Sequence, residues 1–267
     1  MRKRTPELQY LHSIWSPRPG GGYGGGDGGG AKDVFKRLKY SFLSLPRAVQ
    51  VLILLISGLY LLVLFLPAHV ELTLITTLSL TPVDVIGGKV WQIVTYLPVH
   101  ARNDPIGMLF DVIILWSLGG IFAQRWRQMH FLFFYLAGSI GGALFDLLLY
   151  LIFGSAFAAP VWGASAASFS LFVAFFLIFG EQQVSVFGSK PFKGKWVFWA
   201  VFGLQLLFFV TGGNPAFGVQ LGGVITGWLM VTGRWRPRKF KTWMDKLKGK
   251  TAQARRQRQK SRFRVIH

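Results

Sequence analysis

Trp162-Gly163-Ala164-Ser165-Ala166 is a run of mostly small residues near the start of a long apolar stretch, residues 161–180. A transmembrane helix needs about 20 predominantly apolar residues, so this stretch predicts a membrane-spanning helix that carries a serine near one end. Five further apolar stretches of similar length occur in the chain. They are residues 49–66, 106–122, 130–153, 196–210 and 217–232. The sequence therefore predicts an all-α membrane protein with a bundle of six transmembrane helices.

Composition and charge agree with this fold class and give an orientation. Hydrophobic residues make up 52% of the 267 positions and charged residues only 15%, which is outside the range of ordinary soluble domains. If both termini are cytoplasmic, 28 of the 30 basic residues fall on the cytoplasmic side, and only Lys89 and Arg102 fall outside. Because Lys and Arg near span ends are retained in the cytoplasm, we expect cytoplasmic termini. The short loops suggest a bacterial source and hence a multi-pass protein of the cytoplasmic membrane.

The chain divides by composition into three parts. Residues 1–48 are basic and glycine-rich, which predicts a flexible cytoplasmic segment; residues 49–232 form the membrane domain; residues 233–267 are a basic cytoplasmic tail. Cytoplasmic basic segments beside a membrane favour contact with anionic lipids over contact with nucleic acid. Between the first two spans, residues 68–105 are too many for a simple connection. We expect them to form their own structure at the membrane interface, with Trp91 and Tyr96 at the headgroup level.

Several short motifs, taken in order, resemble the rhomboid family of intramembrane serine proteases. Gly163-Ala164-Ser165-Ala166 resembles the family's serine motif, and Leu109-Phe110-Asp111 through Ser117-Leu118-Gly119-Gly120 resembles its second span. Gly223 with Gly227-Trp228 resembles its sixth span. The resemblance covers residues 52 to 232, most of the chain. It implies a six-span rhomboid-like bundle with a serine in span four as the nucleophile.

The resemblance also identifies functional positions that have changed. Ser165 occupies the position of the nucleophile, but the family's catalytic histidine in span six falls on Gln220. The histidine and asparagine that help to hold the oxyanion fall on Gly107 and Asp111. Two further departures are Ala166, in place of the second glycine of the serine motif, and Ala123, in place of a glutamate.

These substitutions remove the chemistry that a serine nucleophile needs. A serine hydroxyl requires a positioned base, and the amide of Gln220 does not titrate near neutral pH. An ionised Asp111 would repel a developing oxyanion, and Gly107 offers no side-chain donor. We therefore predict that protease activity is lost or severely reduced. Inactive relatives of rhomboids bind transmembrane clients, so the resemblance implies transmembrane segments as partners. No cofactor or metal is expected, and the absence of cysteine excludes Cys-ligated metal.

Other interpretations of the same residues remain open. An active endopeptidase with Ser165 as nucleophile would need an unrecognised base, and His100, eleven residues before Asp111, is a candidate without direct sequence support. A protonated Asp111 could instead bond to Gln220 or Ser165 as a polar lock. We expect Asp146, another acidic residue within a predicted span, to be hydrogen-bonded or water-facing. The glycine pairs four residues apart in spans three and six predict close helix packing, which favours a packed bundle over a small-molecule transporter. These pairs are Gly138 with Gly142, Gly218 with Gly222, and Gly223 with Gly227.

Overall fold

The computed structural model describes residues 39–181, 183–184, 192–211 and 215–234. The predicted flexible glycine tract and nearly all of the predicted basic tail lie outside these residues. The chain forms two compact units, Met1–Gly227 and Trp228–His267, which are described separately.

Each of the six predicted spans lies on a helix or an unbroken series of helices. The first and third are α3 (Arg47–Phe65) and α9 (Gln128–Phe153), and the second combines α7 (Pro105–Ile114), the π-turn η1 (Leu115–Gly119) and α8 (Gly120–Arg125). The others are α10 (Ser165–Phe179), α11 (Lys195–Val210) and α12 (Phe217–Thr232). A two-residue antiparallel pair, β1 (Gln183–Val184) with β2 (Phe192–Lys193), lies between α10 and α11. The predicted helical fold class is therefore confirmed.

Three helical stretches in the described part of the chain are long and apolar enough to cross a membrane. They are Arg47–Phe65, Pro105–Arg125 and Gln128–Phe157. Three shorter apolar helices accompany them, namely Ser165–Phe179, Phe198–Val210 and Phe217–Thr232. The chain is thus a multi-pass membrane protein by its helix content, while crossing by all six helices stays a prediction.

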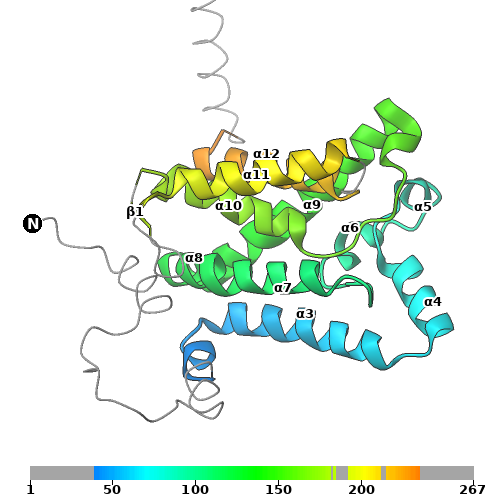
Figure 1. Ribbon diagram of the computed structural model, residues 1–267, viewed down its shortest axis with the longest axis horizontal. Coiled ribbons are helices and arrows are strands. Elements are labelled where there is room, and N and C mark those ends of the chain that lie inside the picture. The colour runs from blue at the N-terminus through cyan, green and yellow to red at the C-terminus, as the bar shows by residue number, and fades with distance from the viewer. Residues whose placement is uncertain (1–38, 182, 185–191, 212–214, 235–267) are drawn as a thin grey trace, which may run out of the picture. The chain divides into compact units, whose positions relative to one another are not determined.

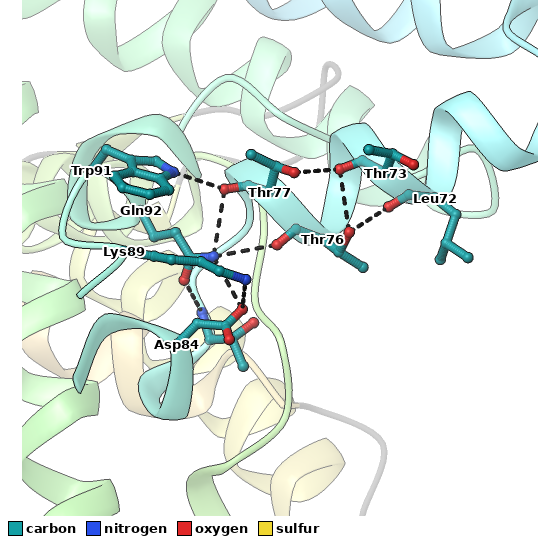
Figure 2. Close-up of polar contacts among 9 residues, drawn as sticks. Leu72, Thr73, Thr76, Thr77, Asp84, Lys89, Trp91 and Gln92 are labelled. Atoms are coloured by element: carbon teal, nitrogen blue, oxygen red, sulfur yellow. Dashed lines mark hydrogen bonds and ion pairs between the residues drawn. The ribbon is translucent and has the colours of Figure 1, made fainter. Parts of the chain in front are cut away.

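The segment between the first two spans has its own structure, as predicted. It contains α4 (Ala68–Leu78), α5 (Pro82–Ile86) and α6 (Gln92–Thr95), which gather at one end of the longer helices (Figure 1). Gln92 holds this segment together (Figure 2), because its amide nitrogen donates to the carbonyl of Thr76 at 3.3 Å and its amide oxygen accepts from the Thr81 N–H at 3.0 Å. The ammonium of Lys89 lies 3.0 Å from the carboxylate of Asp84, and this bond lowers the pKa of Asp84 below its ordinary value.

The two aromatic residues expected at the headgroup level behave differently. Trp91 is about half exposed and donates its indole N–H to the carbonyl of Thr77 (Figure 2). Tyr96 is fully buried, and its hydroxyl donates to the carbonyl of Ser139 on α9 at 2.8 Å. A backbone acceptor inside the bundle thus satisfies the Tyr96 hydroxyl, while the depth of both residues in the membrane stays a prediction.

Arg102 fixes the corner between α3 and α4. Its guanidinium donates to the carbonyls of Val63 and Leu66 at the end of α3, at 3.2 and 2.6 Å. The same group lies 3.1 Å from the carboxylate of Glu71 on α4. Last-turn carbonyls of a helix have no intrahelical partner, so Arg102 acts as a side-chain cap for α3. The two basic residues predicted to lie on the external side of the membrane are Lys89 and Arg102. Both are thus ion-paired.

Replacing Arg102 with methionine should lower the free energy of unfolding by about 2 kcal/mol, because charge-assisted bonds to two carbonyls and a carboxylate are lost. Replacing Lys89 with methionine should lower the free energy of unfolding much less, since it breaks a partly solvent-exposed ion pair. Thermal unfolding of the two purified variants in the same detergent compares them. Equal shifts in melting temperature would contradict the assignment of Arg102 as the capping residue.

Glycines allow α9, α10 and α12 to approach closely. A Cβ added at Gly142 on α9 would lie 2.5 Å from the Cβ of Ala166 on α10 and 2.6 Å from the carbonyl oxygen of Val219 on α12. A Cβ added at Gly223 on α12 would collide with the carbonyl oxygen of Ala166. The other predicted packing glycines, Gly138, Gly218, Gly222 and Gly227, are equally crowded. The interpretation of these glycines as close-packing sites is confirmed.

The described part of the second unit, residues 228–234, contains the last turn of α12 and the residues that end it. Gly233 has a φ of 65°, in the left-handed region that favours glycine after a helix. The guanidinium of Arg234 lies 4.5 Å above the ring of Trp228, a cation–π contact.

Candidate functional site

The residues directly before Ser165 are not helical, so α10 begins four residues later than the predicted start of the span. Val161 and Leu80 exchange two backbone hydrogen bonds of 2.8 Å. The N–H of Gly163 donates to the carbonyl of Tyr96 at 3.0 Å. Residues 161–164, named here the serine segment, are therefore held by the chain between α4 and α7.

Asp104 connects the serine segment to the start of α7. One carboxylate oxygen accepts from the indole N–H of Trp162, and the other accepts from the N–H of Gly107, both at 3.0 Å. The second bond is an N-cap, and Pro105 follows at the first helical position. An acidic residue followed by proline is a recognisable helix start, so this pair in the sequence was a signal for the role of Asp104.

Asp111 lies one helical turn beyond Gly107 on α7 and is the centre of a buried polar network. Its Oδ1 accepts from the hydroxyl of Ser168, and its Oδ2 accepts from the N–H of Ala164, both at 2.7 Å. The Nε2 of His100 lies 3.3 Å from the same Oδ2. The side chains of Asp111, Ser168 and His100 are all buried. The network thus joins α7, α10, the serine segment and the chain before α7.

The predicted partners of Asp111 are wrong. Ser168, Ala164 and His100 bond to it instead of Gln220 or Ser165. Ser168 follows Ser165 by three residues on α10, so the two serines share one side of the helix. The rotation and depth of α7 decide which serine the carboxylate reaches, and a single sequence does not encode these quantities in a local pattern.

Ser165 is the first residue of α10, and its hydroxyl oxygen is buried. Among the described residues, this oxygen has no hydrogen-bond partner. Gln220 is also buried, on the first turn of α12. Ala166 packs against Gly223 one turn further along α12, and Ala166 and Val219 meet at the same glycine of α9. The structure therefore brings the two parts of the chain that carry Ser165 and Gln220 together.

The remaining altered positions, Gly107 and Ala123, have no side chain that could donate a hydrogen bond. A Cβ added at Gly107 would lie 2.5 Å from both carboxylate oxygens of Asp104. A larger residue at this position therefore requires Asp104 to move. Ala123 is buried in α8, at the opposite end of the same span from Gly107.

His100 is the one histidine that the described part of the chain places at this site. Gly163 has a φ of 91°, and a Cβ added there would lie 2.9 Å from the Nε2 of His100. The ring thus packs directly on the serine segment. His69 on α4 and His130 on α9 are exposed, while His12 and His267 lie outside the described residues. No group of three or more potential metal ligands occurs within the described ranges.

The fold and the site together define a multi-pass helical membrane protein with a buried serine at a helix start. Residues 87–237 match the Rhomboid domain family. This match covers more than half of the chain and includes Ser165, Gln220, Gly107 and Asp111. The chain belongs to the rhomboid family. No curated protein matches it.

Proposed function

We propose that this rhomboid-family protein binds transmembrane segments of other membrane proteins, with its protease activity lost or severely reduced. In this proposal all six helices cross the cytoplasmic membrane of the cell and both termini are cytoplasmic. The basic tails contact anionic lipid headgroups. Family membership supports recognition of transmembrane helices, and the arrangement around Ser165 supports the loss of protease activity.

The observation that carries the proposal is the position of the Asp111 carboxylate. It accepts the N–H of Ala164, the residue directly before Ser165, at 2.7 Å. The amino end of α10, which begins at Ser165, carries partial positive charge. Acyl transfer at a serine needs nearby donors to be free for an oxyanion. Here the carboxyl group of Asp111 already accepts a hydrogen bond from one of them, so this N–H is not free for an oxyanion.

The base position agrees with this conclusion. Gln220 cannot accept and return a proton near neutral pH, and the Ser165 hydroxyl has no bonded base in the described chain. Removing the base from a serine catalytic unit costs several orders of magnitude in rate. The two changes act on separate parts of the chemistry, one on proton transfer and one on charge stabilisation.

Labelling with a fluorophosphonate probe tests the proposal. We expect the purified protein and its Ser165→Ala variant to label equally weakly, because Ser165 lacks an activating base. Mass spectrometry of the labelled peptide identifies the site. Strong labelling that disappears in Ser165→Ala would overturn the inactive assignment. Client binding is measured separately, by covalent capture of transmembrane partners in intact membranes with a photo-crosslinker placed on an exposed span residue such as Leu204.

Restoring the residues that the rhomboid family usually has at these positions provides a second test of the proposal. Gln220→His combined with Asp111→Asn returns a base and removes the competing carboxylate. Gly107→His must be paired with Asp104→Ser, since Asp104 fills the space beside Gly107. We expect labelling of Ser165 only in the restored variants, and restoration that depends on Asp104→Ser would identify the crowding as a further block.

One observation favours the alternative, an active endopeptidase. The Nε2 of His100 lies 3.3 Å from Asp111, while its Nδ1 and the Ser165 hydroxyl both lack partners among the described residues. An aspartate that orients a histidine is the supporting half of a Ser-His-Asp unit. In this case fluorophosphonate labelling of Ser165 would be present in the unmodified protein and lost in His100→Gln. Labelling that is absent from both variants rejects this alternative.

A further inference from the structure

Asp146 is a carboxylate on α9 that the site around Ser165 does not use. Only 1% of the residue is exposed, and neither of its oxygens has a hydrogen-bond partner among the described residues. The described residues thus give Asp146 neither the hydrogen bond nor the exposure to water that the sequence predicts. A buried carboxylate within a membrane span is costly and is by default a candidate functional group.

The packing around Asp146 includes a very close approach of α12. Gly218, in the first turn of α12, lies so close that an added Cβ would collide with the Oδ1 of Asp146. The ring of Phe157 borders the same position at 3.2 Å. Along α9, Ala143 and Leu147 belong to the adjacent apolar cluster. The carboxyl group thus lies between α9 and α12 in apolar surroundings.

The elements packed against this part of α9 offer no counter-ion. Within the described chain, α6, α10, α12 and the short helix η2 (Gly154–Phe157) contain no Lys, Arg, His, Asp or Glu. Asp84 on α5 is paired with Lys89. Arg47 on α3 and Arg125 on α8 belong to the end of the bundle where α9 begins, since the N–H of Ala48 donates to Gln128.

Tyr96 is the titratable group that interacts electrostatically with Asp146, and its hydroxyl already donates to the carbonyl of Ser139. An ionised carboxylate in this position would be almost fully buried and, among the described residues, without a cation, and the free-energy cost of such burial is large. The neutral acid removes that cost. Proton binding and close packing of α9 on α12 are therefore coupled.

We propose that Asp146 is a proton-binding site that keeps its proton while α12 packs on α9 and releases it to water when the two helices separate at Gly218. The turn of α12 that covers Asp146 also carries Gln220, and Val219 packs at the glycine that contacts Ala166. Proton release therefore opens the region around Ser165. This inference is independent of whether the site retains protease activity.

The absence of cysteine from the chain allows a direct test. In the Ser165→Cys variant, the single thiol reports access to the site through its rate of reaction with a water-soluble maleimide. Because the packed state holds a proton that the open state releases, the open fraction should rise by up to about tenfold per pH unit. The control is Ser165→Cys combined with Asp146→Asn. Ionisation of the thiol raises the maleimide reaction rate with pH in both variants, so it cancels in the ratio of their rates. We expect the ratio of the two rates to rise with pH, and parallel profiles would overturn the proposal.

A hydrophobic carbodiimide provides a measurement on the unmodified protein, since it reacts with protonated carboxyl groups in apolar surroundings. We expect adduct formation on the peptide that contains Asp146, with a yield that falls as pH rises. Asp111 is the internal control for burial. It is a second buried carboxyl group, but its two oxygens accept hydrogen bonds from Ser168 and Ala164. Absence of the Asp146 adduct at every pH would reject the proton site. Neither result depends on fluorophosphonate labelling, so this proposal and the proposed function can fail separately.

Discussion

Replacing Asp111 with leucine should lower the free energy of unfolding by about 3–5 kcal/mol, as expected when one member of a buried polar network is removed. The N–H of Ala164, the hydroxyl of Ser168 and the ring of His100 would each lose a partner. Each unsatisfied buried group costs about 1–3 kcal/mol. Reversible unfolding in mixed detergent micelles, followed by the loss of helical signal, measures the change.

Two variants make this prediction specific. Asp111→Asn keeps the volume and one acceptor oxygen, so it should cost about 1–2 kcal/mol. Asp84→Leu also removes a carboxylate that accepts two side-chain hydrogen bonds, but Asp84 is about one-third exposed, and water can replace its bonds. We expect Asp84→Leu to lower the free energy of unfolding much less than Asp111→Leu does. If Asp111→Leu were as mild as Asp84→Leu, the buried network would not stabilise the fold.

Replacing Gly223 with alanine should lower the free energy of unfolding by about 3 kcal/mol, at the upper end of the cost of overpacking. The added Cβ would collide with the carbonyl oxygen of Ala166 and lie 3.0 Å from its Cα. These are backbone atoms, so no side chain can rotate away, and α12 must move from α10. The same unfolding measurement in micelles detects the loss.

Gly203→Ala is the matched control for this prediction. Gly203 lies within α11 on an exposed face, and a Cβ added there has no atom within 4 Å. Since alanine is the better helix former by about 1 kcal/mol, Gly203→Ala should be neutral or slightly stabilising. The same chemical change is therefore expected to have opposite effects at two glycines. A loss of stability at Gly203 similar to that at Gly223 would indicate a general intolerance of α11 and α12 to substitution.

Hydrophobic patterning predicts the helices well and their starts less well. The fourth span is predicted from residue 161, but α10 starts at Ser165 because Val161 pairs with Leu80 and Gly163 adopts a positive φ. The pairing of Val161 joins residues far apart in the sequence, and apolarity alone does not distinguish helical from non-helical backbone. The π-turn η1 within the second span is hidden for the same reason, since its residues are as apolar as the flanking turns.

The residues of the candidate site were easier to locate than their partners. Ser165, Gln220, Gly107 and Asp111 are identified by the resemblance of the ordered motifs to those of the rhomboid family. The roles of Ser168 and His100 depend on how far α7 and α10 are rotated toward each other, and that rotation arises from packing across the whole bundle. Asp146 shows the same limit, because its lack of a partner among the described residues follows from the apolar composition of the elements that surround it.

The serine segment has a consequence for how another chain could be recognised. Three backbone N–H groups of this segment already donate hydrogen bonds. Those of Val161 and Gly163 donate to the carbonyls of Leu80 and Tyr96, and that of Ala164 donates to the carboxyl group of Asp111. A polypeptide that adds to a protein as an extra strand relies on unpaired backbone groups along an open edge, and three donors of this edge are already occupied. A transmembrane client of the kind proposed above that leaves the serine segment in place would therefore have to bind through side-chain and helix-surface contacts instead of through these backbone donors.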